Sequence, residues 1–326
     1  MTALAAPPAP RRSRLDRRFL GLVLALLALV LLNALLTPNF LAAQTLAVNV
    51  SQVSTVAIVA LGMTLVIATG GIDLSVGAVM ALAGALAPLI FGSLWGLANP
   101  GLGLAAAIAL PLLAAALCGA FNGALVSLGI QPIIATLILF ISGRGVAQVL
   151  TNGNLQTFTN PSFTWLGTGR VLGFPVQGWI ALLLALLVAL VVRRTLYGRQ
   201  LLAVGGNERA AALAGTPVRA VRIATYVLCA TFAGLAGLID VAINSASDAA
   251  RVGNLMELDA IAAAVVGGAA LSGGRAPILG TLLGACFIQL VGYTLIANGV
   301  PDEATLIVTA GIIVAAVWLQ DARTRR

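Results

Sequence analysis

The sequence contains no lysine and no histidine in its 326 residues, and only 9% of the residues are charged. Soluble domains carry roughly 25% charged residues, so an ordinary water-exposed surface is excluded. The absence of lysine excludes a GxxxxGK[ST] nucleotide loop, because the lysine of that loop reaches the phosphates. The HExxH and GxSxG patterns of hydrolases are missing as well. We therefore expect neither an enzyme nor a chain that hydrolyses ATP by itself.

Cysteine is also scarce. Cys118, Cys229 and Cys286 all lie in apolar segments, and no CxxC pattern is present. Without histidine or paired cysteines, a zinc site is not expected. Buried free cysteines behave as small hydrophobic side chains, which is the role predicted here. We expect no metal and no cofactor on this chain.

Long apolar runs are what the sequence has in abundance. Hydrophobic residues make up 60% of the chain, and residues 19–36 form one unbroken apolar run. In lipid, backbone polar groups need partners within the protein, which favours helices. A transmembrane β-barrel would instead show short segments of alternating hydrophobicity. The sequence therefore predicts an all-α, polytopic integral membrane protein.

The apolar pattern predicts about ten transmembrane helices within one membrane domain at residues 19–320. A disordered basic tail is expected at residues 1–18, and a short tail at residues 321–326. The turn-rich stretch at residues 151–176 is expected to be the longest outer loop. The predicted spans are residues 19–36, 46–69, 74–92, 102–128, 132–150, 177–193, 221–243, 258–272, 277–297 and 304–320.

The arginines set the orientation. Five of the 18 lie in residues 11–18, six in residues 193–222 and three in residues 323–326. These clusters flank apolar spans, as the positive-inside rule requires, so they do not indicate nucleic-acid binding. An even number of spans places both termini on one side of the membrane. We predict that both termini are cytoplasmic.

Asp73 and Ser75 follow the pair Gly70–Gly71 between two predicted spans. A charged side chain at membrane depth is costly and is a functional candidate. Two interpretations are open. The segment is either a helix-to-helix turn in which Asp73 or Ser75 caps the next helix, or a broken helix beside a translocation path.

Arg144 is the basic residue that lies deepest within a predicted span, and Asp240 is a candidate partner for it. The amides Asn122, Gln131 and Gln289 either line a polar path or form hydrogen bonds between helices. The sequence does not separate these two roles.

Residues 205–222 interrupt the apolar pattern with a short, well-delimited helix. Asn207 is a suitable N-cap, and Glu208 matches the positive end of the helix dipole. Alanine-rich sequence follows until Gly215 and Pro217 end the helix. Two turns are too short to cross a bilayer. We interpret this helix as a cytoplasmic knob that fits a groove of another protein.

Three separated motifs resemble ABC-importer permeases of the ribose/galactose sugar group. They are GGNERAAALAGTPVRAVRIATYVL at residues 205–228, IDLSVGA at residues 72–78 and ELDAIAAAVVGGAALSGGRAPILGTLLGA at residues 257–285. Residues 130–151 and the PDEAT motif at residues 301–305 are most similar to the galactofuranose-type branch. The resemblance covers residues 20–320 but carries no substrate-contact residue onto this sequence.

The resemblance implies a permease subunit that imports a monosaccharide and has several partners. They are a periplasmic or surface sugar-binding protein, a second permease subunit in a homodimer or heterodimer, and an ABC-type ATPase that binds ATP. Arg275 lies beside Gly273 and Gly274 and is expected on the ATPase side. The residues implied to contact the ATPase are Asn207, Glu208, Arg209, Ala210, Ala211, Ala212 and Gly215.

Two other transport functions remain as alternatives. An ion-coupled secondary transporter would use ionisable groups at the midplane, for which Asp73 and Asp240 are available. A related ABC permease for branched-chain amino acids would need ionic partners or helix ends to hold a zwitterion.

Overall fold

The computed structural model describes residues 17–301, 304–312 and 314, and these residues are almost entirely helical. Residues 304–312 and 314 are helical as well. The four strands have two residues each: β1 (Gln156–Thr157), β2 (Arg170–Val171), β3 (Phe174–Pro175) and β4 (Ala246–Ser247). The all-α prediction is confirmed. The helices are α1 (Arg17–Leu36), α2 (Ala43–Ala68), α3 (Val76–Phe91), α4 (Leu94–Ala98), α5 (Pro100–Ser127), α6 (Pro132–Leu150), α7 (Pro161–Thr168), α8 (Val176–Arg194), α9 (Leu196–Gly206), α10 (Glu208–Leu213), α11 (Val218–Asn244), α12 (Met256–Val266) and α13 (Ile278–Ala297).

Seven helices in the described part of the chain are long and apolar enough to cross a membrane: α1, α2, α5, α6, α8, α11 and α13. The chain is therefore a multi-pass membrane protein. Two predicted spans are shorter helices than expected. The span at residues 74–92 is α3, which has 16 residues, and the span at residues 258–272 is α12, which has 11. The predicted span at residues 304–320 and both predicted tails lie partly or wholly outside the described residues.

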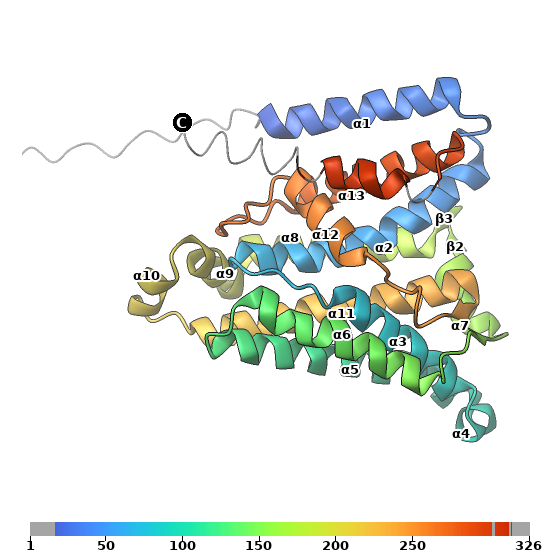
Figure 1. Cartoon of the computed structure of the whole chain (residues 1–326), viewed down its shortest axis with the longest axis horizontal. Helices are drawn as coiled ribbons and strands as arrows, with labels where there is room; N and C mark the ends of the chain where they lie inside the picture. Colours follow the sequence, from blue (N-terminus) through green and yellow to red (C-terminus); the bar gives the residue numbers. More distant parts are fainter. Residues whose placement is uncertain (1–16, 302–303, 313, 315–326) are drawn as a thin grey trace, which may run out of the picture.

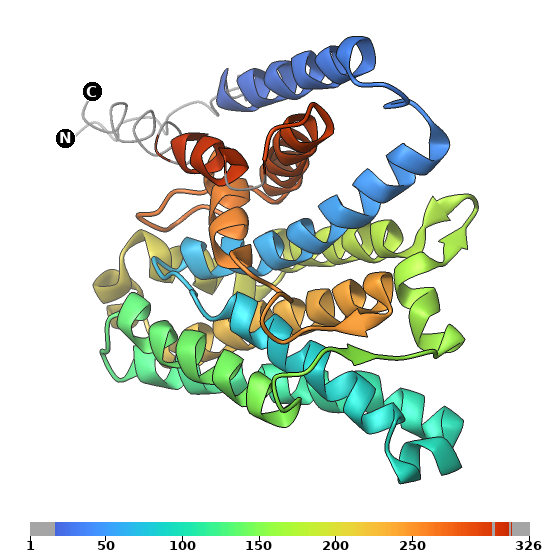
Figure 2. The same cartoon turned by 45° about the vertical axis from the view of Figure 1, so that its right-hand side comes forward.

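The long helices run side by side, and the two ends of the bundle differ (Figure 1). Helices α9 and α10 lie at one end, which we call the coupling end. Helices α4 and α7 and the hairpin of β2 and β3 lie at the opposite end, which we call the outer end. Figure 2 shows the same division after rotation of the molecule. Each long helix therefore connects the two ends directly.

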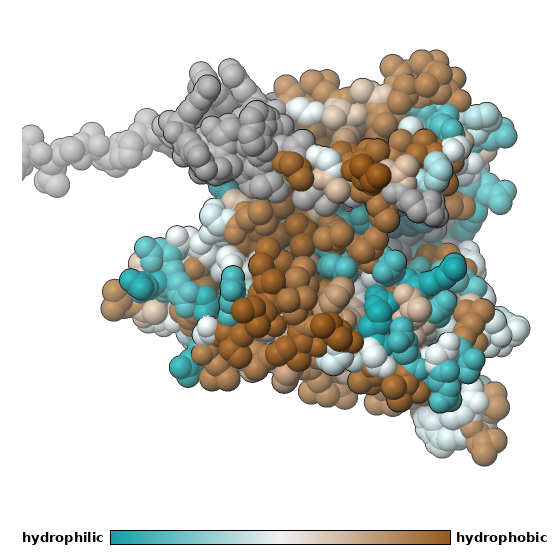
Figure 3. All heavy atoms as spheres, in the orientation of Figure 1, coloured by the Kyte–Doolittle hydropathy of each residue, from teal (hydrophilic) through white to brown (hydrophobic). Residues whose placement is uncertain are grey.

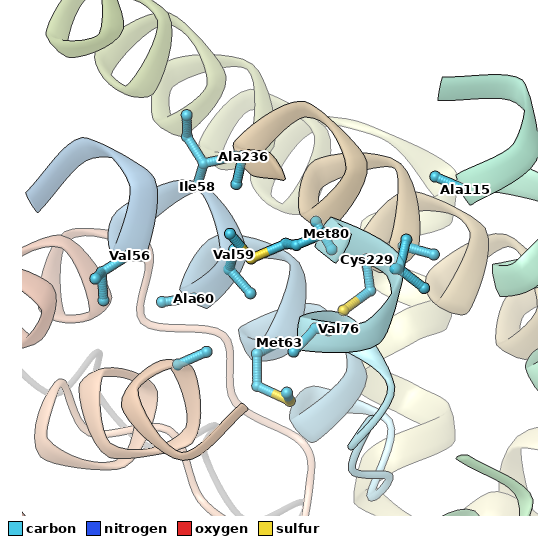
Figure 4. Packing of buried hydrophobic residues seen from close by; sticks show 14 of the residues in the cluster. Val56, Ile58, Val59, Ala60, Met63, Val76, Met80, Ala115, Cys229 and Ala236 are labelled. Atoms are coloured by element: carbon cyan, nitrogen blue, oxygen red, sulfur yellow. The ribbon is translucent and has the colours of Figure 1, made fainter. Parts of the chain in front are cut away.

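Helices α2 and α11 form the centre of the bundle. Buried residues make up 78% of the apolar span of α2 and 67% of that of α11, but only 11% of that of α1. A Cβ added at Gly62 would lie 2.8 Å from the Cα of Cys229, so the two helix backbones approach closely. Met63, Met80 and Cys229 pack together where α2, α3 and α11 meet (Figure 4).

Helix α1 lies at the edge of the bundle beside α13. The amide of Asn33 donates a hydrogen bond to Oγ1 of Thr294 over 2.7 Å, and Asn298 donates one to Oγ1 of Thr37 over 3.1 Å. The other sides of α1 carry exposed leucines, as do α5, α6 and α8. Brown apolar surface covers much of the face shown in Figure 3. Such surface is suited to contact with lipid tails.

The predicted outer loop contains a short helix and short strands. Between α6 and α8 the chain forms β1, helix α7 and the hairpin of β2 and β3. Strand β1 pairs with β4, which follows α11, so the loop is joined to a distant part of the chain. Phe158 and Phe163 also pack against Phe91 of α3. These contacts fix the segment onto the ends of α3 and α11.

Candidate functional site

The coupling segment, residues 195–216, consists of two short capped helices. Oγ1 of Thr195 accepts a hydrogen bond from the backbone N–H of Gly198 and caps α9, a helix that the sequence analysis missed. Oδ1 of Asn207 accepts from the N–H of Ala210 over 3.0 Å, as predicted, and caps α10. Gly215 follows α10 with a φ of 82°, which suits the left-handed conformation that ends many helices.

Two polar contacts hold the coupling segment to α11. Glu208, the first residue of α10, forms an ion pair with Arg222. The hydroxyl of Tyr197 lies 2.8 Å from Oγ1 of Thr225, which itself donates to the carbonyl of Val221, so Tyr197 is the donor. Burial raises the pKa of Tyr197 to about 12, so its hydroxyl stays neutral at physiological pH. The first turns of α11 and the coupling segment therefore form one unit.

A close backbone contact ties the coupling segment to α2 and to the loop before α13. A Cβ added at Gly205 would lie 1.7 Å from the carbonyl oxygen of Ala68, the last residue of α2. The same carbonyl accepts a hydrogen bond from the N–H of Gly274 over 2.9 Å. Gly273 lies directly against the backbone of Gly205, and Arg275 is exposed beside it. The prediction that Arg275 lies on the coupling side is confirmed.

Most of α10 faces outward. Of the seven predicted contact residues, Asn207, Glu208, Arg209, Ala210, Ala212 and Gly215 are exposed. Ala211 is instead buried, so its side chain does not belong to the exposed surface of α10. Leu213, which the prediction left out, is 92% exposed at the end of the helix. An exposed leucine among alanines makes an apolar tip that is suited to a groove on another protein.

Two helices begin inside the bundle rather than at its ends. After α2 ends, residues 69–75 run back into the bundle before α3 starts, and residues 248–255 do the same before α12 (Figure 1). The two helix starts meet: a Cβ added at Gly77 would lie 2.2 Å from the carbonyl oxygen of Gly253 and 2.6 Å from Oε2 of Glu257. We call residues 72–77 and 249–257, together with Asn122, the junction. Interrupted helices of this kind surround binding sites in transporters.

The junction brings together three of the predicted polar residues. Oδ1 of Asp73 accepts hydrogen bonds from the N–H and the hydroxyl of Ser75, over 2.9 and 2.7 Å. The amide of Asn122, on α5, donates to Oγ of Ser75 over 2.9 Å. All three side chains are fully buried. The segment is therefore a turn between two helices with buried polar side chains, but Ser75 makes no capping hydrogen bond to α3.

Three buried side chains of the junction have an acceptor atom without a partner in the described chain. Oδ2 of Asp73, Oδ1 of Asn122 and Oε2 of Glu257 are buried and form no hydrogen bond with the described chain. Asp73 precedes α3, and Glu257 lies in the first turn of α12, where the helix dipoles stabilise negative charge. No group of three or more potential metal ligands occurs among the described residues.

The predicted pairing of Arg144 with Asp240 is wrong. The guanidinium of Arg144 donates to the carbonyls of Ala249, Ala250 and Val252, over 2.9 to 3.1 Å, and so holds the loop of the junction against α6. Its charge also interacts with Glu257 and Asp248. Asp240 instead accepts a hydrogen bond from Asn244 of the next helical turn.

The remaining two predicted residues lie apart from the junction. Gln131 is exposed at the start of α6 and makes no capping hydrogen bond. Gln289 of α13 donates to Oε1 of Gln52 of α2 over 2.8 Å, so it joins two helices nearer the outer end. Gln52 was not predicted, although a glutamine within an apolar run was the same signal that singled out Gln289.

Comparison with known families decides what this architecture is. The family described as "Branched-chain amino acid transport system / permease component" matches residues 45–317. The chain belongs to this family. The family description assigns the permease a transport role and not a catalytic one, in agreement with the expectation that the chain is not an enzyme.

Curated relatives of the permease cover nearly its whole length. It is 40% identical to the galactofuranose transporter permease protein YtfT of Escherichia coli (strain K12), over 92% of this chain and 89% of the relative. It is 42% identical to the ribose import permease protein RbsC of the same strain, over 92% of this chain and 93% of the relative. It is 37% identical to the fructose import permease protein FruF of Bifidobacterium longum (strain NCC 2705), over 80% and 73%. The resemblance to sugar importer permeases is confirmed, and no solved structure matches the chain.

Proposed function

We propose that the permease is the membrane subunit of an ATP-driven monosaccharide importer. The observation that carries the proposal is the coupling segment, a capped helix pair fixed to α2 and α11 that presents the exposed tip of Leu213. The chain has no nucleotide loop of its own, so an ABC-type ATPase that binds ATP is the proposed partner at this surface. Relatives named for galactofuranose, ribose and fructose support a sugar as the cargo.

The proposed topology has ten crossings, with both termini in the cytoplasm and the coupling segment on the same side. The seven long helices supply seven crossings. Helices α3 and α12, each with its extended leading segment, supply two more, and the helix that begins at residue 304 supplies the tenth. The arginine clusters of residues 11–18, 193–222 and 323–326 then all face the cytoplasm of a bacterial inner membrane.

A second permease subunit is proposed on the face formed by α6, α12 and the loop between β4 and α12. Ser142, Arg251 and Asn254 are exposed there, and teal patches lie among brown ones on this face (Figure 3). Polar groups at membrane depth are costly against lipid. A partner subunit and a water-filled path between the two copies would remove that cost. A periplasmic or surface sugar-binding protein would deliver the cargo to the outer end.

Reconstitution tests the proposed function. Proteoliposomes that contain the permease with its co-purified ATPase and binding protein should accumulate ribose, galactose or fructose only when ATP is present on the side of the coupling segment. Uptake that persists without ATP but stops when ionophores collapse the ion gradients would contradict the proposal and support an ion-coupled transporter.

The family description also keeps a branched-chain amino acid as a second candidate cargo. The junction offers two acidic groups, which could hold the ammonium of a zwitterion, and two helix starts, which could hold its carboxylate. ATP-driven uptake of leucine, with no uptake of any sugar, would decide for this second candidate.

A further inference from the structure

A polar cleft opens at the outer end, away from both the junction and the coupling segment. Its volume is about 260 Å³. Helix α2 forms one wall, and the end of α7, strand β2, the start of α8 and the last turn of α11 form the others. We call it the outer cleft. Its polar lining consists of Gln44, Ser51, Gln52, Thr168, Arg170 and Gln177.

Gln177 gives the outer cleft a buried acceptor without a partner. Its Nε2 donates a hydrogen bond to the carbonyl oxygen of Gly167. A carbonyl only accepts, so this contact fixes which end of the amide is the nitrogen. Oε1 therefore lies on the other side of the amide, where it forms no hydrogen bond with the described chain although the side chain is only 1% exposed. A buried amide oxygen in this position can still accept a hydrogen bond, from water or from a ligand.

The rest of the lining complements this acceptor. Gln44, Gln52 and Arg170 are exposed at the rim. Oε1 of Gln52 accepts from Gln289, which leaves the Nε2 donor of Gln52 free within the described chain. Val48 and Ile243 supply apolar wall. Amide donors, an amide acceptor and apolar surface together match a small polyol ring, which carries hydroxyls on its edge and C–H groups on its faces.

We propose that the outer cleft binds one monosaccharide on its way into the permease, with Oε1 of Gln177 accepting a hydrogen bond from a sugar hydroxyl. This proposal rests on the proposed sugar-import function and names the site that receives the cargo. The volume of the cleft lies below the roughly 300–1,000 Å³ of pockets for drug-sized ligands, as a single sugar ring requires.

The two helices that wall the cleft also reach the coupling end. Helix α2 carries Gln52 in the cleft and ends at Ala68, whose carbonyl contacts Gly205 and Gly274. Helix α11 carries Ile243 in the cleft, and its first turns carry Arg222, the partner of Glu208. A rigid shift of either helix therefore moves the outer cleft and the coupling segment together. Binding in the cleft is linked to the ATPase surface through these two continuous helices.

Uptake kinetics of the complete importer in proteoliposomes test the proposal. Ribose, galactose and fructose are tested, and the sugar with the highest uptake is used for the variants. Gln177→Met keeps the length of the side chain but removes the acceptor, so the KM should rise about tenfold, as expected for one lost hydrogen bond in a binding site.

A second cleft variant and a control keep the result interpretable if Gln177→Met folds poorly. Gln44 is exposed and makes no side-chain hydrogen bond in the described chain, so Gln44→Ala should fold normally and raise the KM about threefold. Asn154 is an exposed amide of the outer end that does not line the cleft, and Asn154→Ala should leave the KM unchanged.

The outcomes separate the two proposals. In the first outcome, the wild-type permease takes up sugar, and folded Gln177→Met and Gln44→Ala have the same KM as the wild type. This result overturns the outer cleft as the sugar site but leaves the import function intact. Wild-type permease that takes up none of the three sugars while it takes up leucine overturns the import function, and the cleft proposal falls with it.

Discussion

The coupling end and the junction both consist of small and polar residues, yet their hydrogen bonds are completed to different extents. At the coupling end Thr195 and Asn207 cap their helices, and Glu208 is paired with Arg222. At the junction the buried side chains of Asp73 and Glu257 each keep one oxygen without a partner in the described chain. The capping and ion-pairing groups of the coupling end have their partners, whereas the junction retains capacity for further hydrogen bonds.

The same contrast extends along the bundle. Six buried side-chain atoms in the described part of the chain form no hydrogen bond, and none of them belongs to the coupling segment. Three belong to the junction, and the others belong to Asn49, Gln177 and Ser247, toward the outer end. Buried acceptors without a partner in the described chain therefore lie at the junction and toward the outer end, and the coupling segment has none of them. The predictions below test this difference.

The largest effect is expected at Gly205. Its substitution by alanine places a Cβ against the carbonyl of Ala68, so the coupling segment must move away from α2. We expect Gly205→Ala to lower ATP-driven uptake more than tenfold at equal membrane insertion. Gly206→Ala is the matched control, because a Cβ there meets no atom within 4 Å. Equal uptake by the two variants would contradict a rigid coupling contact.

At the junction, Gly77→Ala should destabilise the fold. The added Cβ would meet the carbonyl of Gly253 and Oε2 of Glu257, and overpacking of this kind costs about 3 kcal/mol. The measurement is the free energy of unfolding in mild detergent. Gly145→Ala, where a Cβ has open space, is the control and should be as stable as the wild type. A normal stability of Gly77→Ala would show that the two helix starts do not pack closely.

A smaller loss of stability is expected from Arg144→Leu. The variant leaves the carbonyls of Ala249, Ala250 and Val252 without their donor, and hydrogen bonds to a charged group contribute about 2 kcal/mol. A lower melting temperature in detergent would report the loss. Arg251 is 90% exposed, so Arg251→Leu should change stability by at most about 0.5 kcal/mol. Indistinguishable melting of the two variants would mean that Arg144 does not hold the loop.

The smallest effect is expected from Tyr197→Phe. It removes the hydroxyl that donates to Thr225 and should cost about 1 kcal/mol of unfolding free energy. The ion pair of Glu208 with Arg222 still holds the segment, so uptake should stay within twofold of the wild type. Tyr293→Phe removes a hydroxyl that makes no hydrogen bond in the described chain and serves as the control. A loss of uptake in Tyr197→Phe alone would mean that this hydroxyl is required for coupling.

Local rules predicted the coupling end well. The cap at Asn207 and the stop at Gly215 depend on neighbours within a few residues, and the structure has both. The cap at Thr195 follows the same rule and could have revealed α9, but the arginines around it favoured interpretation as a loop. The burial of Ala211 and the exposure of Leu213 depend on how α10 lies on the bundle, which the sequence does not state.

The junction could be predicted only in part. Asp73 and Ser75 were recognised from their position after two glycines, but their partner Asn122 lies 47 residues beyond Ser75. The apolar pattern of residues 258–272 is the same for a short helix inside a bundle as for a full crossing, so the early end of α12 at Val266 gave no signal. The partners of Arg144 are backbone carbonyls, which carry no side-chain pattern at all.

The most direct test of the account is the association of the ATPase with the coupling helix. Wild-type permease and the variant Leu213→Asp are each purified in mild detergent from their own cells, and the retained subunits are quantified by mass spectrometry. Leu213 is 92% exposed, so the variant should fold and insert as the wild type does. The account predicts an ABC-type ATPase in near-equal amount with the wild type and at least a tenfold loss of it with the variant. Equal retention of the ATPase by both, or no ATPase with the wild type under conditions that keep other importers intact, would contradict the account.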